Sequence, residues 1–272
     1  MPELPEVETT RRGIAPSLEG RRIVTIEVRQ PRLRWPVPTA RLRRELAGQR
    51  VISVTRRAKY LLLGTPSGTA LLHLGMSGSL RVLPTGTPPG VHDHVDLGLE
   101  NGQCLRLHDP RRFGALLWTR RDPLRHPLLR DLGPEPFDPA FDGAYLRARA
   151  DGRRIAVKPF LMDGRVVVGV GNIYASEALH RAGIDPRRAA GRISLARYAR
   201  LAETVRKVLG EAIEVGGTTL RDYTDSRGEA GWFKIRLAVY GRANLPCPGC
   251  GFPLRGVQLA NRSTFFCSRC QR

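Results

Sequence analysis

The chain has 272 residues, and its 45 Lys and Arg outnumber its 25 Asp and Glu, which gives a formal net charge of +20 at pH 7. A hydrophobic content of 41%, spread along the chain, is enough for a packed core and disfavours disorder; about two domains are expected. No apolar run approaches the roughly 18 residues of a membrane span, and the acidic start MPELPEVE is unlike a secretory signal. We therefore expect a cytoplasmic protein with a polyanionic partner, nucleic acid before membrane. A compositional bias toward Arg is the alternative, since only four of the basic residues are lysines.

The first half of the chain predicts one helix followed by a β-rich domain. Apolar residues recur near one face over about residues 2–18, which predicts the helix. Short β-type runs follow, and Asn101-Gly102 between the last two is typical of a hairpin turn. The expected strands are 23–28, 51–55, 60–63, 70–74, 80–83, 95–99 and 104–107. Many short strands with turn residues between them predict a β-sandwich or barrel of about 130 residues.

The second half changes to helical periodicity. Residues 122–142 are rich in proline and predict an ordered connection between domains. Asn172 is expected to cap a helix that stops at Gly183, and Ser194 to cap a second, strongly amphipathic helix. The helical part therefore spans roughly 145–222.

Four of the five cysteines form the pattern C-x2-C-x16-C-x2-C near the end of the chain. They are Cys247, Cys250, Cys267 and Cys270. This spacing is typical of a tetrahedral zinc site built from two knuckles, whereas two disulfides would require an exported protein. Four thiolates leave no open coordination position, so we expect one structural zinc ion. Cys104, in a strand-like run, is expected to be a small core residue.

The N-terminus offers a possible nucleophile. Initiator methionine is normally removed before a small residue, and removal of Met1 would give Pro2 a free secondary amine. An α-amino group titrates near pH 8, so part of it is neutral and nucleophilic at pH 7. The neighbouring Glu3 could donate a proton to a departing oxygen. The alternative stays open, because Pro and Glu are also favoured in the first turn of any helix.

Several other positions combine residue types that suit nucleic-acid contact. Met76 lies in a Gly-flanked turn and Arg111 and Phe113 share another, as expected of wedges that enter a base stack. Arg262 follows Asn261 between the two knuckles, where the tip of a zinc-anchored hairpin would project toward phosphate. Each of these is also compatible with ordinary turn chemistry.

Three further signals are weaker. Lys59 heads an apolar strand and suits either a phosphate contact, a proton shuttle or a solvated strand end. His92 and His94 share a strand face, but two ligands alone are a weak metal signal and a phosphate contact is as compatible. The run 169–172 precedes a helix and could seat a phosphate, although it lacks the third Gly and the Lys-Ser/Thr of nucleotide motifs.

Seven segments together resemble one family. They are PELPEVETTRRG, RRAKYLLL, HLGMSGSLR, DPRRFGA, VVGVGNIYASEAL, GGTTLRD and the terminal cysteine ribbon. In this order they resemble the bacterial formamidopyrimidine-DNA glycosylases, the 8-oxoguanine glycosylase/AP lyases, from Pro2 to Gln271. The resemblance implies an α+β multidomain fold: an N-terminal helix with a β-sandwich, a helix-two-turn-helix domain and a C-terminal four-cysteine zinc-finger hairpin, with DNA in the cleft between the halves.

The resemblance also implies catalytic roles. Pro2 matches the nucleophile that forms a Schiff base with C1′, and Glu3 the acid that protonates the sugar ring oxygen. Lys59 matches the proton donor in β-elimination, and Arg262 the zinc-finger arginine that grips phosphate and assists δ-elimination.

It further implies a set of DNA contacts. Met76, Arg111 and Phe113 match the residues that fill the gap left by the flipped nucleotide and probe the opposite base. Residues matched to other DNA contacts are His92, Arg111, Arg154, Lys158 and Asn172. Arg154 takes a place often held by Lys, which keeps the charge but changes the geometry. Residues 219–233 match the lesion-capping loop, to which we assign no contact.

The sequence therefore predicts a base-excision repair enzyme for oxidised purines that nicks the abasic strand by β,δ-elimination. Its expected domains are 1–130, a linker 131–144, a helix-two-turn-helix domain 145–235 and a zinc finger 236–272. We expect a nucleoid-associated bacterial monomer that binds damaged double-stranded DNA and needs no small-molecule cofactor. One alternative is an endonuclease VIII-like glycosylase for oxidised pyrimidines, which usually begins PEGPE. The other is a zinc-ribbon DNA-binding protein without catalysis.

Overall fold

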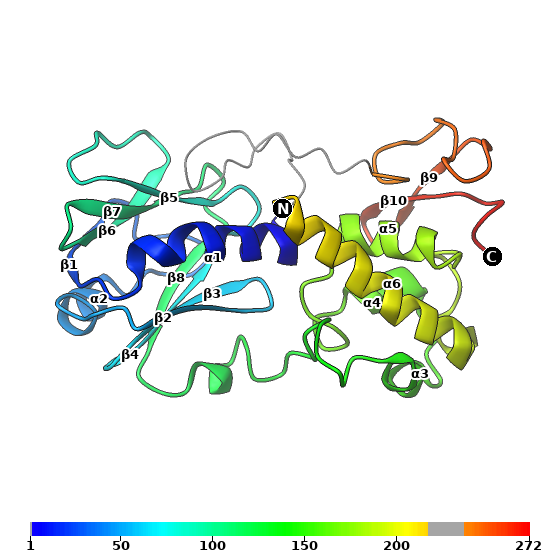
Figure 1. Cartoon of the computed structure of the whole chain (residues 1–272), viewed down its shortest axis with the longest axis horizontal. Helices are drawn as coiled ribbons and strands as arrows, with labels where there is room; N and C mark the ends of the chain where they lie inside the picture. Colours follow the sequence, from blue (N-terminus) through cyan, green and yellow to red (C-terminus); the bar gives the residue numbers. More distant parts are fainter. Residues whose placement is uncertain (1, 217–236) are drawn as a thin grey trace. The chain divides into compact units, whose positions relative to one another are not determined.

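The computed structural model of the chain describes residues 2–216 and 237–272. These form two compact units, one reaching to Arg130 and the other beginning at Asp131 (Figure 1). The predicted capping loop, 219–233, lies outside the described residues, and the three predicted domain boundaries stay a prediction. Among the helices that the structure describes, none is long and apolar enough to cross a membrane.

The first unit is a β-sandwich of two four-stranded antiparallel sheets, as predicted. One sheet has the order β1-β6-β7-β5, and the other has the order β2-β3-β4-β8. The first contains β1 (Ile23–Val28), β5 (Ser79–Pro84), β6 (Asp93–Leu99) and β7 (Gln103–His108). The second contains β2 (Ser53–Arg57), β3 (Tyr60–Thr65), β4 (Gly68–His73) and β8 (Ala115–Thr119). The predicted Asn101-Gly102 hairpin joins β6 to β7, and Gly102 takes the positive φ of 76° that such turns need.

A single apolar core fills this sandwich and also receives the N-terminal helix. α1 (Leu4–Leu18) buries Val7, Ile14 and Leu18 among leucines and valines from both sheets. α2 (Thr39–Glu45) adds Leu42 to the same core. Because α1 is anchored along its length, the residues that precede it are held at one place on the unit.

Two elements of the sandwich were not predicted. The strand β8 has the sequence ALLWT, an apolar run with no alternation, so no period-2 pattern marks it. The helix α2 has one buried residue and otherwise mostly polar positions, too few for a periodic signal. Cys104 is buried in β7, as predicted for a small core residue.

Among the described residues, the second unit contains four α-helices, of which the last two were predicted individually and the first two only as part of a helical span over roughly 145–222. They are α3 (Gly143–Ala150), α4 (Val157–Met162), α5 (Asn172–Arg181) and α6 (Leu195–Glu214). α6 is strongly amphipathic and buries one face, including Tyr198, Leu201 and Val205. Gly183 follows α5 with a φ of 69°, as predicted for its stop. Short 3₁₀ turns occur at Pro123–Arg125 in the first unit and at Ala190–Arg192 in the second.

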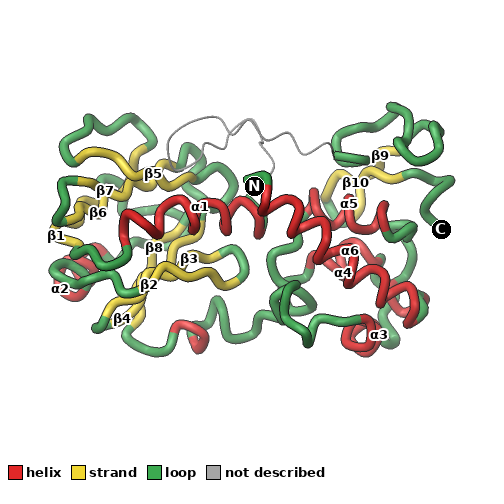
Figure 2. The backbone as a smooth tube through the Cα atoms, in the orientation of Figure 1, coloured by secondary structure: helices red, strands yellow, loops and turns green. Residues whose placement is uncertain are grey.

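A two-stranded hairpin ends the chain. β9 (Arg255–Leu259) pairs with β10 (Arg262–Phe266), and Ala260 and Asn261 form the tight turn with φ values of 48° and 58°. Figure 2 shows that strands occur in the sandwich and in this hairpin, while the second unit otherwise consists of helices and the loops that join them. The hairpin core contains few buried residues, two of them cysteines.

Candidate functional site

The N-terminal segment is held in a capping box. Glu3 occupies the N-cap of α1; its side chain accepts from the Glu6 backbone N–H, and its own N–H donates to Glu6 Oε2 at 2.8 Å. Both carboxyl side chains are almost fully buried, and Pro2 is buried as well. The preference of Pro and Glu for a helix start and their proposed catalytic roles are therefore compatible. The same capping box that starts the helix also fixes where Pro2 and Glu3 lie.

An ion-pair cluster ties α1 to the sandwich one turn further along. Glu8 bonds Arg11 at 2.8 Å and Arg12 at 3.0 Å on its own helix, and Arg56 of β2 at 3.2 Å. Burial raises the pKa of Glu8, but the hydrogen bonds and charges of these guanidinium groups outweigh it and hold the pKa below its usual value. The carboxylate is thus ionised and joins the N-terminal helix to the strand that leads to Lys59.

Lys59 lies in the two-residue turn between β2 and β3, and Ala58 takes a φ of 55° there. Its positive charge acts on His73 at the end of β4. Burial is the main cause that lowers the pKa of His73 to about 4, and the charges of Lys59 and Arg34 lower it further. His73 is therefore neutral at pH 7, and its Nδ1 accepts the Gly75 N–H at 2.9 Å. Its ring packs on Tyr60, with centroids 4.7 Å apart.

The predicted wedge residues lie on two turns of the sandwich. Met76 is half-buried in the turn between β4 and β5. Arg111 and Phe113 project from the turn between β7 and β8, and Phe113 is 42% exposed. The Arg111 guanidinium lies over the Phe113 ring, 5.1 Å from its centroid. An apolar ring covered by a planar cation is well suited to stack against bases.

The histidine pair divides into one buried and one accessible ring. His94 is buried, and its Nε2 lies 2.8 Å from the carbonyl oxygen of Asp109. His92 is partly exposed, with its ring centroid 6.5 Å from that of His94. Among the described residues, only the four terminal cysteines form a cluster that could hold a metal ion. A phosphate contact is thus the better hypothesis for His92.

Asn172 is not the cap of its helix, contrary to the prediction. Gly171 occupies the N-cap, and Asn172 is the first residue of α5. Its Nδ2 donates to the Tyr240 hydroxyl at 3.2 Å, and its buried Oδ1 has no hydrogen-bond partner among the described residues. The Asn172 side chain therefore contacts Tyr240 and does not cap the helix.

Glu177 fixes Tyr240 from one turn further along α5. Its buried carboxylate accepts the backbone N–H groups of Ala238, Val239 and Tyr240 at 2.8, 3.0 and 2.9 Å. The Tyr240 ring packs edge-on against Phe265 of β10. One carboxylate therefore connects the start of α5 to the hairpin.

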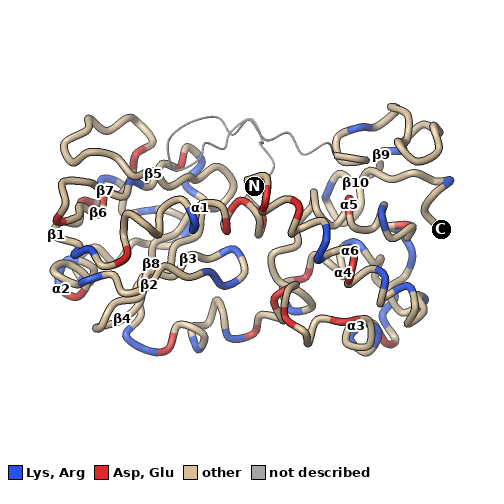
Figure 3. The backbone as a smooth tube through the Cα atoms, viewed as in Figure 1, with Lys and Arg blue, Asp and Glu red and all other residues tan. Residues whose placement is uncertain are grey.

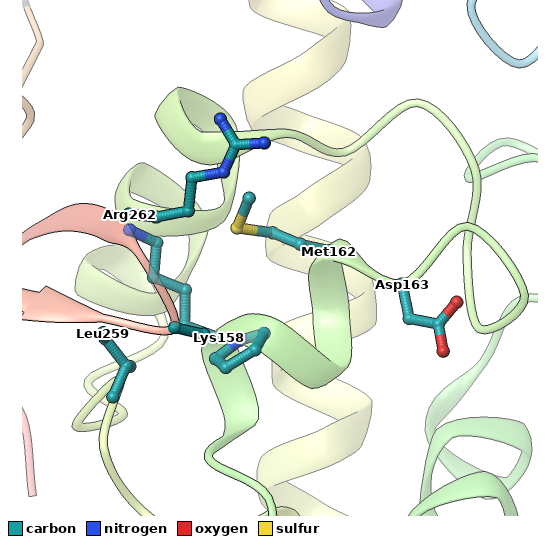
Figure 4. A pocket seen from close by; sticks show the side chains of 7 residues that line it. Lys158, Met162, Asp163, Leu259 and Arg262 are labelled. Carbon is teal, nitrogen blue, oxygen red and sulfur yellow. The ribbon is translucent and has the colours of Figure 1, made fainter.

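Arg262 projects from the first position of β10, directly after the predicted hairpin tip. It borders a cavity of about 170 Å³ together with Lys158, Pro159, Met162, Asp163, Leu259 and Ala260. The ammonium of Lys158, almost fully buried, donates to Ser263 O at 3.0 Å and to Thr264 Oγ1 at 2.8 Å. Figure 4 shows the Lys158 side chain running up to the hairpin beside Arg262, whereas Asp163 points away from both.

The two other predicted basic contacts differ in exposure. Lys158 holds the strand that carries Arg262, so its direct contact with DNA stays a prediction. Arg154 is exposed just before α4 and is free to reach solvent or phosphate. Lys and Arg are spread over both units, so total charge does not by itself mark the contact surface (Figure 3).

The four terminal cysteines form a site that fits zinc. Their sulfurs all lie within 4.8 Å of one another, and the pairs Cys247–Cys270 and Cys250–Cys267 are 3.9 and 3.5 Å apart. Sulfurs around a tetrahedral zinc ion lie about 3.8 Å apart, whereas a disulfide needs about 2 Å. Burial raises the pKa of Cys267, but N–H groups of Cys270 and Arg269 and the neighbouring thiols bring it down to about 7, whereas hydrogen bonding with Cys250 and burial raise the pKa of Cys270 to about 12. The cluster is therefore consistent with a structural zinc site, and these sulfur separations do not fit disulfides.

Several supporting residues escaped the sequence analysis. Ser77, Asp109, Glu177 and Tyr240 act through contacts between distant segments. His180 of α5 is another, with its Nε2 at 3.5 Å from Cys247 Sγ. The only signal in advance was that Ser77, Asp109 and Glu177 lie within the segments HLGMSGSLR, DPRRFGA and VVGVGNIYASEAL, which gave them no role.

Three family models match the chain in succession. They are the formamidopyrimidine-DNA glycosylase N-terminal domain over residues 1–116, the formamidopyrimidine-DNA glycosylase H2TH domain over 132–224, and the zinc finger found in FPG and IleRS over 244–272. The proteins named formamidopyrimidine-DNA glycosylase from Syntrophotalea carbinolica and Methylococcus capsulatus are each 62% identical over 272 residues, covering both chains fully.

Solved structures agree with these matches. The MutM (Fpg) protein of Thermus thermophilus has a TM-score of 0.88 and 42% identity, covering 99% of this chain and 98% of its own. Wild-type Lactococcus lactis Fpg, bound to DNA containing N7-benzyl-Fapy-dG, has a TM-score of 0.90 and 31% identity over the full length of both chains.

Proposed function

This chain belongs to the formamidopyrimidine-DNA glycosylase family, and from that premise we propose that it excises oxidised purines from DNA and then cleaves the abasic strand. The lesions are 8-oxoguanine and formamidopyrimidines. The observation that supports this proposal is the 62% identity, over the full length, to proteins named formamidopyrimidine-DNA glycosylase. They favour purine lesions over the pyrimidine lesions of endonuclease VIII, and a bifunctional enzyme over a non-catalytic DNA-binding protein.

The reaction begins at the N-terminus. After removal of Met1, the Pro2 amine attacks C1′ as the bond from C1′ to the damaged base breaks, and the base leaves with a proton. Glu3 donates a proton to the sugar ring oxygen, which opens the ring and gives an iminium between Pro2 and C1′. The capping box supports these roles, because it holds Glu3 buried within one residue of the amine.

The iminium acts as an electron sink for strand cleavage. Loss of a C2′ proton breaks the 3′ C–O bond in β-elimination, and loss of a C4′ proton then breaks the 5′ C–O bond in δ-elimination. Lys59 acts as the proton donor in β-elimination. The neighbouring His73 is neutral, so it does not compete with Lys59 as a cation at this place. Arg262 holds the phosphate that departs in the second step.

DNA binding is assigned to both units. Met76, Arg111 and Phe113 fill the gap left by the flipped nucleotide, and extrusion is easiest for damaged bases. Asn172 and Arg262 hold phosphates. For Asn172, a half-turn of the amide lets Tyr240 donate to Oδ1 and frees both N–H donors for a phosphate oxygen. His92, Arg154 and Lys158 add contacts to the backbone.

Zinc supplies no chemistry in this scheme. Its four thiolate ligands would be Cys247, Cys250, Cys267 and Cys270, which fix the hairpin that carries Arg262. We further propose that the protein is a monomer, divided at the predicted domain boundaries. We place it in the bacterial cytoplasm at the nucleoid, because its substrate is chromosomal DNA.

Borohydride trapping tests the proposal. We expect incubation with duplex DNA carrying one 8-oxoguanine opposite cytosine, followed by borohydride, to give a covalent complex that maps to Pro2. Glu3→Gln should slow formation of the trapped iminium by about 10²- to 10⁴-fold yet bind the duplex with unchanged affinity. The absence of a trapped species from protein that still binds the duplex would refute the lyase assignment.

A further inference from the structure

The two turns that carry the wedge residues lie against each other. Gly75, next to Met76, has a φ of 65°, and a Cβ built there would lie 2.3 Å from the Phe113 carbonyl carbon and 2.5 Å from Gly114 N. No side chain fits in that space, so the two backbones touch only because residue 75 is glycine. Met76 and Phe113 thus start from adjacent points, although 37 positions separate them in the sequence.

Hydrogen bonds join the same two turns. The Ser77 hydroxyl donates to Asp109 Oδ1 at 2.9 Å and accepts the Arg111 backbone N–H at 3.3 Å. Asp109 Oδ2 accepts the Gly114 N–H at 2.6 Å. Asp109 is fully buried, and Ser77 is 6% exposed. A buried carboxylate that accepts these hydrogen bonds fixes the positions of its donors. Leaving a buried donor or acceptor without a partner costs more free energy than a typical hydrogen bond contributes to stability.

The Asp109 backbone extends this network to the histidine strand. Its N–H donates to His92 O at 2.9 Å, and its carbonyl oxygen lies 2.8 Å from His94 Nε2. On the other side, His73 Nδ1 accepts the Gly75 N–H. The Met76 turn, the Arg111–Phe113 turn and His92 are therefore positioned from one buried centre.

We infer that Asp109 and Ser77 are positioning residues that couple the two turns, so that Met76, Arg111 and Phe113 enter the DNA stack as one unit. This inference rests on the proposed function. Independent turns would have to be ordered separately as the DNA is opened, and ordering each residue costs conformational entropy. Coupling through Asp109 orders both turns when the protein folds, so this entropy is not lost again when DNA binds. It also links the residues that fill the gap to those that probe the opposite base.

Two variants test the coupling without touching a wedge side chain. Ser77→Ala removes the hydroxyl, and Asp109→Asn replaces one acceptor with a donor while keeping the shape. We expect each to slow single-turnover excision of 8-oxoguanine from duplex DNA about tenfold, the effect of one lost hydrogen bond to a charged group. The ratio of excision opposite cytosine to excision opposite adenine should move toward one.

A second substrate separates this inference from the proposed function. A single-stranded oligonucleotide with one abasic site needs no wedge, so both variants should trap on it with borohydride as fast as the unmodified protein. Equal slowing on both substrates would mean that the residues only stabilise the sandwich, and it would overturn the inference. Failure of the unmodified protein to trap would instead refute the proposed function.

A matched control and a double variant complete the test. Ser67→Ala removes a hydroxyl that donates to Glu45 O at 3.0 Å in the same unit, and it should leave both rates and the ratio unchanged. If Ser77 and Asp109 act through each other, the double variant should be no slower than the slower single variant. Additive slowing, or an unchanged opposite-base ratio in both single variants, would refute the coupling.

Discussion

The two units carry the proposed DNA-contact side chains on similar tight turns but hold those turns by different means. The wedge turns of the sandwich sit at strand ends above one large apolar core. The hairpin that carries Arg262 has a core of only Val239, Cys247, Leu254 and Cys267, half of which are metal ligands. So small a core cannot fold a segment by itself. The hairpin must therefore depend on zinc and on buried charges, whereas the sandwich depends on its own packing.

The buried charges around the hairpin show the same dependence. Lys158 bonds to the β10 strand and Glu177 to the segment before the first knuckle. His180 adds a contact to Cys247 Sγ, of the kind that commonly orients a metal ligand. All three residues belong to α4 and α5, so the helical part of the unit supports the hairpin from outside. The wedge turns are supported from within, by Asp109.

The largest expected effect tests the dependence on zinc directly. Cys250→Ser should release the metal, unfold the hairpin and weaken duplex binding by at least about tenfold, because metal binding and folding are coupled in such small domains. The sandwich should keep its unfolding midpoint, since it shares no ligand with the site. Zinc content after gel filtration and fluorescence anisotropy with labelled duplex measure the two effects.

A matched variant in the other unit should give the opposite pattern. Cys104→Ser lies in the buried β7 strand, so it should lower the stability of the sandwich and leave the zinc content unchanged. Zinc retained in Cys250→Ser, or lost in Cys104→Ser, would contradict the distinction between the units.

A smaller effect is expected from the side chain at the hairpin tip. Arg262→Ala should remove one phosphate contact, so the slope of log affinity against log salt should fall by about one, with roughly tenfold weaker binding at low salt. The fold of the hairpin and its zinc content should not change, because Arg262 contributes nothing to the hairpin core.

The control for this variant removes an equal charge nearby. Arg269 is exposed on the second knuckle, and Arg269→Ala changes net charge by the same amount without altering the tip. Binding titrations over a range of salt concentrations compare the two. Equal slopes in both variants would show that charge alone, and no specific phosphate contact, accounts for the effect.

The two units also differ in how far sequence alone could predict them. The sandwich, the cysteine site and the hairpin tip follow from patterns within short segments: strand runs, cysteine spacing, and the position of Arg262 between two knuckles. Such features depend on neighbours in the chain and are visible without a fold. The catalytic roles proposed for Pro2 and Glu3 came from family resemblance, because helix-start preferences explain the same residues.

The supporting contacts could not be predicted because they join distant segments. Ser77 and Asp109 are 32 positions apart, and Lys158 and Thr264 are 106 apart. Each of these residues looks like an ordinary turn, helix or strand residue in its own segment. Asn172 shows the consequence, since its type and place suited a helix cap until Tyr240, 68 positions away, was seen to hold it. Lys158 likewise shows burial that no local pattern indicates.

The smallest expected effect concerns pH and belongs to the sandwich. The pKa of His73 is lowered to about 4 by burial and by Lys59 and Arg34, whereas in the unfolded chain it is near 6.5. Between those values the unfolded chain binds more protons than the folded one. The contribution of His73 to the free energy of unfolding is therefore fully present above about pH 6.5 and declines as the pH falls toward 4. Because His73 is intermediate in exposure, solvent screens part of this effect, and we expect a loss on the order of 1 kcal/mol at pH 5.

A non-titrating variant isolates this contribution. His73→Gln keeps a side-chain oxygen that can accept the Gly75 N–H, so urea unfolding at pH 7 and pH 5 should differ less for the variant than for the unmodified protein. Other groups that titrate in this range, such as His94 in the same unit, cancel in that difference. Zinc retention should not respond to the substitution, because His73 lies in the unit that does not contain the metal ligands. If both proteins lose the same stability between the two pH values, then His73 does not hold the Met76 turn in its neutral form, and the wedge turns depend on Asp109 alone.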